Sequence, residues 1–405
     1  MTDCIVIGAG PAGMTAAYAA SARGKSVVLL EKNEKTGKKI YLTGKGRCNL
    51  TNNCDEKTFL DNIFVNRSFL YSAVYAFPPE RVMDLLGEGG LKMKTERGGR
   101  VFPVSDKASD VTRSLNRLMI EAGVEIRLNS EVSEILFENG NVRGVKLKGG
   151  ETLESENVIL ATGGESYPST GSDGFGYRLA ESAGHTIDAT RPALVSMLSD
   201  EKWIEGLAGL SLKNVGVTLY EKGRKPVSEF GEMLFTHRGV SGPVILTLSC
   251  LVEEFMDTYI TIDLKPALDE QTLDSRILRD FGEFSNKDFK NSLDELLPGR
   301  LRDKIVALAG IRPDKKVNQI TAEERKRLVT LLKQLRLNIN GTGGFDEAIV
   351  TRGGINVKEI DPKRMASKLV KGLYFAGEII NAHGYTGGFN MQQAFSTGYL
   401  AGSSV

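Results

Sequence analysis

The first thirty residues change between apolar and glycine-rich segments in a way that predicts a strand, a helix and a second strand. Residues 4–7 are a continuous apolar run, which is typical of a strand buried on both faces of a parallel sheet. Residues 14–22 are mostly small and apolar, and Gly24 follows them as a residue suited to end a helix. Residues 26–30 form a second, mostly apolar run that stops at Glu31. The pattern therefore predicts one βαβ unit of an α/β domain.

Similar patterns recur later in the chain and predict the rest of this domain. The expected elements are helices and a hairpin at 53–104, an amphipathic helix at 109–122, a strand and then a turn at 123–135, a small β-meander at 142–148 and 151–154, a strand from 156 that ends in 161–164, a strand at 372–376, and a C-terminal helix from about 390–392 to 399.

The pattern changes near residue 191. Short alternating runs over 193–264 predict a compact β-barrel or sheet, and the charged segment 269–334 has helical spacing. Glycine-rich sequence returns at Gly341. We therefore expect the first part of the α/β domain at 1–190, an inserted β-barrel and helical domain for the substrate at 191–340, and the last part of the α/β domain at 341–405.

Three glycines after the first strand, Gly8, Gly10 and Gly13, have the G-x-G-x-x-G spacing of a dinucleotide-binding turn. The first permits a tight turn, the second lets the backbone approach a pyrophosphate, and the third lets the helix pack on the strand. The helix N-terminus offers N–H groups to phosphates, and Glu31 can accept hydrogen bonds from an adenosine ribose. Since Glu31 would repel a 2′-phosphate, the ligand expected here is FAD or NAD(H).

The C-terminal segment favours FAD. The expected strand at 372–376 is followed by Gly377 and Glu378, then by a glycine-rich loop and a helix. This order resembles the second FAD motif of the glutathione-reductase-type flavoproteins, in which the acid binds the ribityl chain or the pyrophosphate. By that resemblance the helix N-terminus faces the N1–C2=O edge of the flavin, where it stabilises negative charge. Gly388 would let the backbone approach the ring.

Two further segments agree with this resemblance. The stretch Ala161-Thr162-Gly163 resembles the ATG motif of the same proteins, where the chain passes close to the dinucleotide. Val132 then lies where backbone groups bind the adenine.

Four long stretches, 37–52, 234–246, 348–361 and 372–398, resemble the BaiN/RdsA-type bacterial flavoproteins. The resemblance implies non-covalent FAD in a Rossmann-like domain of the glutathione-reductase type, interrupted by a middle domain. Members include an enone reductase of bile-acid steroids and an oxidase of small amino ketones such as aminoacetone. The residues expected to bind the cofactor are Gly8, Ala9, Gly10, Pro11, Ala12, Gly13, Glu31, Lys32, Lys38, Lys39, Gly46, Arg47, Cys48, Asn49, Val132, Ala161, Thr162, Gly163, Gly377, Glu378, Gly388, Phe389, Asn390, Met391 and Gln392.

Cys48 and Cys54 raise the question of a redox disulfide, because related disulfide reductases place a C-x4-C pair soon after the ribose-binding acid. Here the spacing is C-x5-C, and the Asn and Thr residues between the cysteines favour turns rather than a helix. We therefore predict no redox role for the pair. Residues 44–49 are expected to fold over the isoalloxazine instead, with Lys38, Lys39, Lys45 and Arg47 offering cations to phosphate or to reduced flavin.

The sequence does not identify a catalytic acid or base. His383, Tyr385 and Arg47 are candidates by position alone, and no cluster of residues has the spacing of metal ligands. No second G-x-G-x-x-G unit follows between residues 164 and 341. If NAD(P)H is the electron donor, it is expected to bind without a Rossmann unit of its own.

The composition limits the kinds of partner that we expect for this protein. The 405 residues include 52 basic and 51 acidic ones, a balance that gives no footprint for nucleic acid or for an anionic membrane. Four cysteines in a chain of this length suggest a reducing, cytoplasmic location. The expected partner is a small-molecule substrate, with neither nucleic acid nor membrane.

Three functions stay open at this stage. The first is an NAD(P)H-dependent reduction of an α,β-unsaturated ketone, such as a 3-oxo-Δ4 steroid or bile acid, with hydride transfer through flavin N5. The second is an oxidase of a small amine or amino ketone that forms hydrogen peroxide. The third is a non-catalytic or RNA-modification flavoprotein.

Overall fold

The computed structural model describes residues 2–283 and 285–405 and divides the chain into two compact units. One unit combines Met1–Ala193 with Gly344–Val405, and the other is Leu194–Gly343. The expected breaks after residues 190 and 340 each lie three residues earlier than these.

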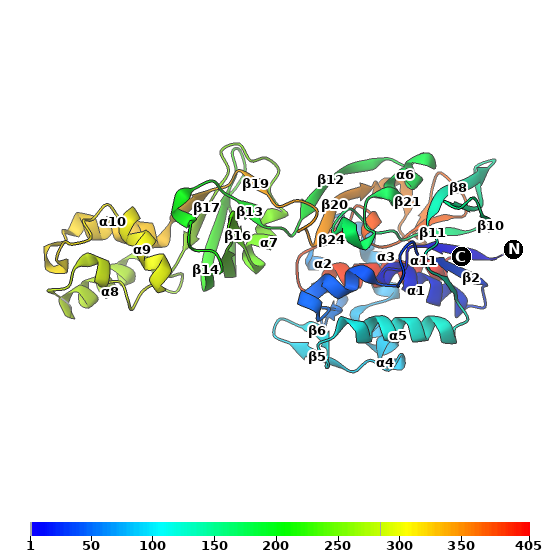
Figure 1. The fold of residues 1–405 in the computed structure, drawn as a ribbon, viewed down its shortest axis with the longest axis horizontal. Coiled ribbons are helices and arrows are strands. Elements are labelled where there is room, and N and C mark those ends of the chain that lie inside the picture. Colours follow the sequence, from blue (N-terminus) through cyan, green and yellow to red (C-terminus); the bar gives the residue numbers. More distant parts are fainter. Residues whose placement is uncertain (1, 284) are drawn as a thin grey trace. The chain divides into compact units, whose positions relative to one another are not determined.

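A seven-stranded sheet forms the centre of the first unit (Figure 1). Five strands pair in parallel, and four of them are short apolar runs buried on both faces, whereas β7 lies partly exposed at the edge. The carboxyl ends of these strands meet at one edge of the sheet, which is where ligands bind in such folds. The strand order is β21 (Ile360–Asp361), β22 (Ala366–Ser367), β23 (Leu373–Phe375), β11 (Val158–Leu160), β1 (Cys4–Ile7), β2 (Val27–Leu30) and β7 (Glu125–Arg127).

Two helices, α1 (Pro11–Ser21) and α11 (Phe389–Ser403), cross each other at very close range. A Cβ on Gly398 would lie 2.2 Å from the carbonyl oxygen of Ala12, and one on Gly402 would lie 2.1 Å from that of Ala16. The C-terminal helix keeps two glycines in its interior, because the contact with α1 leaves no room for a side chain. It ends at Ser403, four residues later than expected.

Smaller elements surround this sheet. The two strands expected for the meander are confirmed as β9 and β10, and β8 joins them as a third strand; the expected hairpin at the end of 53–104 is β5 and β6, and β3 pairs with β6. Two further ribbons join segments far apart in the chain, β4 with β24 and β12 with β20. The bounds are β3 (Thr51–Asn52), α2 (Glu56–Asp61), β4 (Ile63–Val65), α3 (Tyr71–Ala76), α4 (Pro79–Glu88), β5 (Met93–Glu96), β6 (Arg100–Pro103), α5 (Ala108–Glu121), β8 (Val132–Glu138), β9 (Asn141–Leu147), β10 (Thr152–Glu154), α6 (Phe175–Ser182), β12 (Ile187–Ala193), β20 (Val350–Ile355) and β24 (His383–Gly384).

The second unit holds another seven-stranded sheet and its own hydrophobic core. Its strand order begins with β18 and ends with β19, which are two neighbouring pieces of one extended segment. The sheet would close into a barrel if this segment joined its first and last strands. The β-barrel expected from the sequence therefore stays a prediction. The order is β18 (Leu335–Asn338), β17 (Tyr259–Asp263), β14 (Ser211–Tyr220), β15 (Val227–Phe235), β16 (Gly239–Ser241), β13 (Met197–Leu198) and β19 (Gly341–Thr342), with helices α7 (Pro243–Ser249), α8 (Glu270–Glu283), α9 (Gly299–Leu308) and α10 (Ala322–Lys333).

Candidate FAD site

The turn between β1 and α1 has three glycines in three different environments. Gly8 has φ of 100°, and a Cβ there would lie 2.6 Å from the carbonyl oxygen of Ala161. A Cβ on Gly13 would lie 1.8 Å from the carbonyl oxygen of Gly8. A Cβ on Gly10 would meet no atom within 4 Å. Two glycines thus serve the packing of the protein, and Gly10 alone leaves room for a ligand at the start of α1.

The start of α1 is open to an anion. Gly10 is the N-cap, Pro11 occupies the first turn, and no side chain caps the helix or places an acid there. A helix leaves its first backbone N–H groups without partners of its own, so those near Ala12 can bind phosphate.

The carboxylate of Glu31, at the end of β2, is held by neutral donors. Its Oε2 accepts from Ala9 N–H at 2.9 Å, and its Oε1 accepts from Asn33 N–H at 2.9 Å and from Asn33 Nδ2 at 2.7 Å. Glu31 is 9% exposed. The acid is therefore fixed beside the glycine turn, where the ribose of a dinucleotide binds in this fold.

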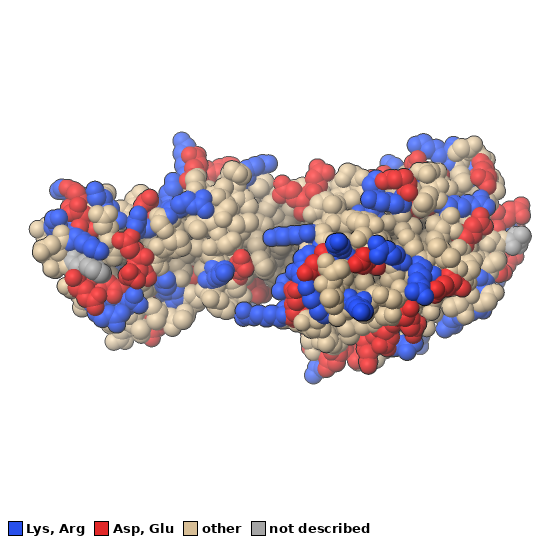
Figure 2. Space-filling view, turned by 60° about the horizontal axis from the view of Figure 1, so that its bottom comes forward, with Lys and Arg blue, Asp and Glu red and all other residues tan. Residues whose placement is uncertain are grey.

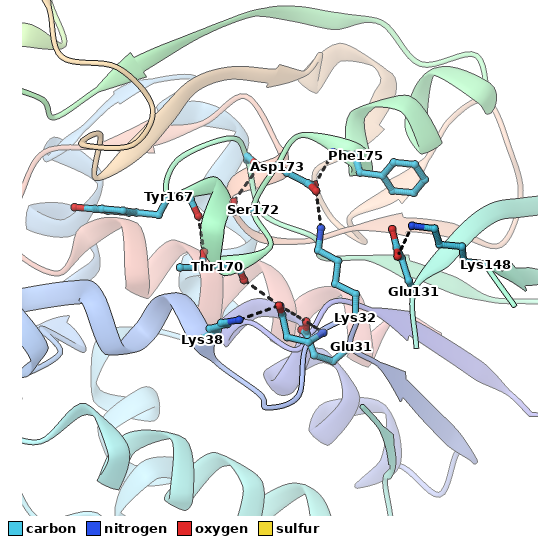
Figure 3. Close-up of polar contacts among 12 residues, drawn as sticks. Glu31, Lys32, Lys38, Glu131, Lys148, Tyr167, Thr170, Ser172, Asp173 and Phe175 are labelled. Atoms are coloured by element: carbon cyan, nitrogen blue, oxygen red, sulfur yellow. Dashed lines mark hydrogen bonds and ion pairs between the residues drawn. The ribbon is translucent and has the colours of Figure 1, made fainter. Parts of the chain in front are cut away.

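Figure 3 shows that lysines near Glu31 contact protein groups. Lys32 Nζ lies 2.8 Å from Asp173 Oδ2, and Lys38 Nζ lies 3.3 Å from Asn33 Oδ1. Neither lysine is placed as an isolated phosphate-binding cation. Both instead support the segment around Glu31.

The ATG segment after β11 lies against the same turn. Ala161 N–H donates to the carbonyl oxygen of Ile7 at 2.9 Å, and a Cβ on Gly163 would lie 2.8 Å from Ser172 Oγ. Thr162 Oγ1 is buried and has no hydrogen-bond partner among the described residues. Val132 is the first residue of β8, pairs with Leu147 and is buried.

Glu378 follows β23 and lies in a charged network. Its Oε2 is 2.7 Å from Lys39 Nζ, and its Oε1 accepts from Ser166 Oγ at 2.6 Å and from Thr351 N–H at 2.9 Å. Burial raises the pKa of Glu378, but the Lys39 ammonium and the two hydrogen bonds outweigh it, so the pKa is lowered. Lys39 thus keeps Glu378 ionised, a role that the sequence did not reveal.

The glycine loop before α11 is packed against the chain itself. Gly388, the N-cap, has φ of 100°, and a Cβ there would lie 2.4 Å from the carbonyl group of Thr51. The idea that Gly388 makes room for the flavin is therefore wrong: the space belongs to β3. The space beside Gly377 is likewise occupied, since a Cβ added there would lie 2.7 Å from the Cβ of Ala12.

The first side chains of α11 hold the loop. Asn390 exchanges two hydrogen bonds of 2.9 Å with the backbone of Gly384. Gln392 is fully buried, accepts from Thr51 Oγ1 at 2.6 Å and donates to the carbonyl oxygen of Phe77 at 3.0 Å. Phe389 is buried against Phe59, and Met391 is half-buried. Only the backbone N–H groups of this first turn stay suited to an anionic edge.

The loop of residues 44–49 is strained. Gly44, Lys45, Gly46 and Cys48 all have positive φ, and two of them carry side chains. Such strain persists where the surroundings enforce it, often at functional sites. Asn49 is half-buried, and its side-chain oxygen, when turned toward Gly388, accepts from that N–H at 3.0 Å.

Arg47 is occupied by acids. It forms ion pairs with Glu96 and with Asp106, the latter at 2.7 Å, and its guanidinium lies 4.1 Å from the ring centroid of Phe102. The hydrogen bonds to Glu96 and then Asp106 raise the pKa of Arg47. Its charge serves the β5–β6 hairpin.

All four cysteines are free thiols. Burial raises the pKa of Cys48 to about 12 and that of Cys54 to about 11. Neither thiol is activated as a nucleophile.

His383 and Tyr385 lie on the loop before α11, and both contact Phe64. The His383 ring is edge-on to Phe64 at 4.5 Å, and Tyr385 stacks on it at 5.0 Å. His383 is 2% exposed, and both ring nitrogens lack hydrogen-bond partners among the described residues. Burial, with a smaller contribution from Arg352, lowers the pKa of His383 to about 3. The ring is enclosed by protein, a position unsuited to proton transfer with a substrate.

These residues fit FAD. The open position at Gly10, the uncapped starts of α1 and α11, and the two acids after β2 and β23 are the groups that a flavin dinucleotide needs. Within the described parts of the chain, no group of three or more His, Cys, Asp or Glu could hold a metal ion. No helix there is long and apolar enough to span a bilayer.

The fold and this site define a FAD-dependent oxidoreductase of the Rossmann type. The chain belongs to the HI0933-like family, since the family model described as "HI0933-like protein Rossmann domain" matches residues 2–404. The chain is similar to a ribosomal RNA dihydrouridine synthase of Escherichia coli K12, with 33% identity over 409 residues that cover 100% of this chain and 98% of that protein. It is 31% identical to a 3-dehydro-bile acid delta(4,6)-reductase of Clostridium scindens, over 99% of this chain and 98% of that protein.

Solved structures agree on the fold. A 3-ketosteroid-delta4-(5alpha)-dehydrogenase from Rhodococcus jostii RHA1 superimposes with a TM-score of 0.51 and 16% identity, covering 100% of this chain and 96% of that one. The FrdA subunit of Escherichia coli quinol fumarate reductase gives 0.52 and 17%, covering 99% and 69%. These likenesses show the architecture alone.

Several residues that hold the two acids of the site were not predicted from the sequence. Asn33, Ser166 and Thr351 act through contacts with Glu31 or Glu378 that join distant parts of the chain. Only their places beside recognisable motifs, such as the serine three residues after Gly163, could have drawn attention to them.

Proposed function

We propose that this protein is an NAD(P)H-dependent FAD reductase of a carbon–carbon double bond conjugated to a carbonyl group. The observation that carries the proposal is the similarity over the whole chain to two relatives with different substrates. Converting uridine to dihydrouridine and reducing the Δ4,6 bonds of a 3-oxo steroid both add two hydrogens to a double bond conjugated with a carbonyl. We therefore infer the chemistry that the two relatives share and not the substrate of either one.

FAD, when bound, supplies hydride transfer at its N5. The chain's own contribution is electrostatic and positional. The first turn of α11 carries no acidic residue and directs N–H groups along its axis, which favours negative charge at a flavin edge. Lys39 keeps Glu378 ionised, so this acid can accept hydrogen bonds from hydroxyl groups of the cofactor.

A half-reaction experiment tests the proposal against an oxidase. The yellow protein is reduced anaerobically with NADH or NADPH, and its reoxidation is followed with a 3-oxo-Δ4 steroid, with uridine-containing RNA and with oxygen. We expect a conjugated acceptor to reoxidise the flavin at least tenfold faster than air-saturated buffer. Reoxidation by oxygen alone, together with reduction by aminoacetone, would favour the oxidase.

A uridine in RNA is a second candidate substrate, and the β5–β6 hairpin favours it. Lys45, Lys92, Arg97 and Lys107 lie on or beside this hairpin, are exposed, and have no acidic partner among the described residues. The neighbouring acids, Glu96 and Asp106, already pair with Arg47 and Lys94.

The hairpin also lies next to the C-terminal glycine loop. Asn52 Nδ2 donates to the carbonyl oxygen of Gly98 at 2.9 Å and to that of Gly387 at 3.1 Å. Basic and acidic side chains are interspersed over the face drawn in Figure 2, so contact with RNA would depend on this local set.

Mass spectrometry tests this second candidate. A ribosomal RNA fragment is incubated with the protein and NADPH, digested to nucleosides and searched for uridine heavier by two hydrogens. The Arg97→Glu variant should lower RNA turnover and leave steroid turnover unchanged. An equal loss with Lys363→Glu, an exposed lysine in the turn between β21 and β22, would show a general charge effect.

A further inference from the structure

The carboxylate of Glu31 owes its orientation to the residue two positions later. Asn33 contributes both its N–H and its Nδ2 to Glu31 Oε1, at 2.9 and 2.7 Å. The remaining protein donor, Ala9 N–H, binds the other oxygen. The carboxylate is thus fixed before a nucleotide arrives, and its remaining lone pairs face a limited set of directions.

Asn33 also ties down a second segment of the chain. Its Nδ2 donates to the carbonyl oxygen of Thr170 at 3.0 Å, and the adjacent Lys32 pairs with Asp173 at 2.8 Å (Figure 3). Gly171 packs between these contacts, since a Cβ there would lie 2.6 Å from Asn33 Nδ2 and 2.9 Å from Lys32 Cε. We call residues 167–173 the strap.

The other side of the strap is anchored to the ATG segment. Ser172 Oγ donates to the carbonyl oxygen of Gly164 at 2.9 Å, and Gly174 N–H donates to the same oxygen at 3.1 Å. The strap therefore joins the end of β2 to the loop after β11. Both of these belong to the edge of the sheet where the dinucleotide binds.

We propose that Asn33 is a positioning residue for the adenosine half of FAD: it orients Glu31 toward the ribose and, with the Lys32–Asp173 pair, clamps the strap at the ribose pocket. The clamp slows release of the cofactor. This role concerns retention of the dinucleotide and does not depend on the substrate that the flavin reduces.

FAD release from the holoprotein tests the clamp. Dissociation is followed by the rise in flavin fluorescence after dilution of the holoprotein into a large volume of flavin-free buffer, where rebinding is negligible. Asn33→Ala removes a hydrogen bond to a charged group and should speed release by about tenfold. Asp173→Asn removes a partly exposed ion pair and should speed it by about twofold to threefold. Each variant's apoprotein melting temperature checks that it is folded.

Lys148→Ala is the control, because Lys148 forms a more exposed ion pair with Glu131 at 3.0 Å that takes no part in the strap (Figure 3). It should leave FAD release unchanged. Competition with ADP and with FMN adds a readout that general loosening would not give. The Asn33→Ala apoprotein should bind ADP about tenfold more weakly and FMN as tightly as the wild type.

Unchanged FAD release in both clamp variants would overturn the proposal. An equal loss of ADP and FMN affinity would overturn it as well, because the effect would then not be confined to the adenosine half. Since no step uses an electron acceptor, these outcomes are independent of the reductase assay.

Discussion

The two turns of the FAD unit are both rich in glycine, but the space beside their glycines is used in opposite ways. The first turn lies between β1 and α1, and the second lies between β24 and α11. At the first turn, Gly10 borders open space. At the second, the backbone of Thr51 occupies the space where a side chain on Gly388 would lie. A glycine in a cofactor motif therefore does not by itself mark the approach of a ligand, and only the surroundings tell which kind it is.

The acids that follow β2 and β23 differ in the groups that hold them. Glu31 is held by neutral donors, two backbone N–H groups and an amide. Glu378 is held by the Lys39 ammonium together with a hydroxyl and a backbone N–H. The acid of the C-terminal half thus depends on a charge from a distant segment of the chain, whereas the donors to Glu31 all come from residues 9–33.

Substitution of Gly388 should have the largest effect. Gly388→Ala places a methyl group 2.4 Å from the Thr51 backbone at a left-handed residue, and we expect a loss of roughly 3 kcal/mol or more in the free energy of unfolding. Urea denaturation measures this. Gly24→Ala is the control: its φ is 83°, and its Cβ would meet nothing within 4 Å. A similar loss for both variants would mean that backbone strain, not the contact with β3, dominates.

Gly10→Val should separate cofactor binding from stability. Gly10 has φ of −78° and ψ of −178°, an extended conformation that valine adopts readily, and its side-chain position is open. We expect the apoprotein to unfold within about 1 kcal/mol of the wild type. FAD affinity should fall at least a hundredfold, or about 2.7 kcal/mol. Full flavin content in the purified variant would disprove the placement of the pyrophosphate.

Lys39→Met tests the dependence of Glu378 on its cation. The variant leaves a carboxylate in a half-buried site without its ion pair, and we expect a loss of about 1–3 kcal/mol in stability, together with weaker FAD binding. The double variant Lys39→Met/Glu378→Gln should recover part of the stability, since the uncompensated charge is gone. Equal stability of the wild type and Lys39→Met would show that solvent replaces the ammonium.

The sequence was sufficient for the elements and motifs that depend on local pattern. The βαβ unit, the meander and the C-terminal strand and helix were predicted because apolar periodicity and glycine spacing are properties of neighbouring residues. The sequence could not predict what fills the space beside Gly388, which acids pair with Arg47, or that protein encloses His383. Each is decided by residues that are far away in the chain, such as Thr51, Glu96 and Phe64.

His383 makes the C-terminal loop sensitive to acid. Its pKa of about 3 in the folded protein lies below the ordinary value of 6.5, so below pH 6.5 the unfolded chain binds a proton that the folded chain does not. Stability should therefore fall as the pH is lowered from 6.5 toward 3, by about 2 kcal/mol at pH 5.

His383→Phe provides the comparison for this effect. The ring contact with Phe64 can be kept, and no hydrogen bond is lost, because neither imidazole nitrogen has a partner among the described residues. Melting temperatures from pH 7 to pH 5 should decline less steeply than in the wild type. A variant that melts normally but has lost its activity would instead assign His383 a direct part in the reaction.

The smallest effect is expected for Cys54→Ser, which tests the loop that the C-terminal glycines pack against. The pKa of Cys54 is raised to about 11 and that of Cys48 to about 12, by burial first of all, so both are thiols rather than thiolates at neutral pH. A thiol is a poor nucleophile for disulfide exchange. Turnover should stay within about twofold of the wild type, because the half-buried thiol has no role in the reaction and serine is close to cysteine in size. Reductive titration should consume two electrons per flavin in both proteins. Two additional electrons in the wild type alone would reveal a redox disulfide, and the C-terminal loop would then pack against a second redox centre.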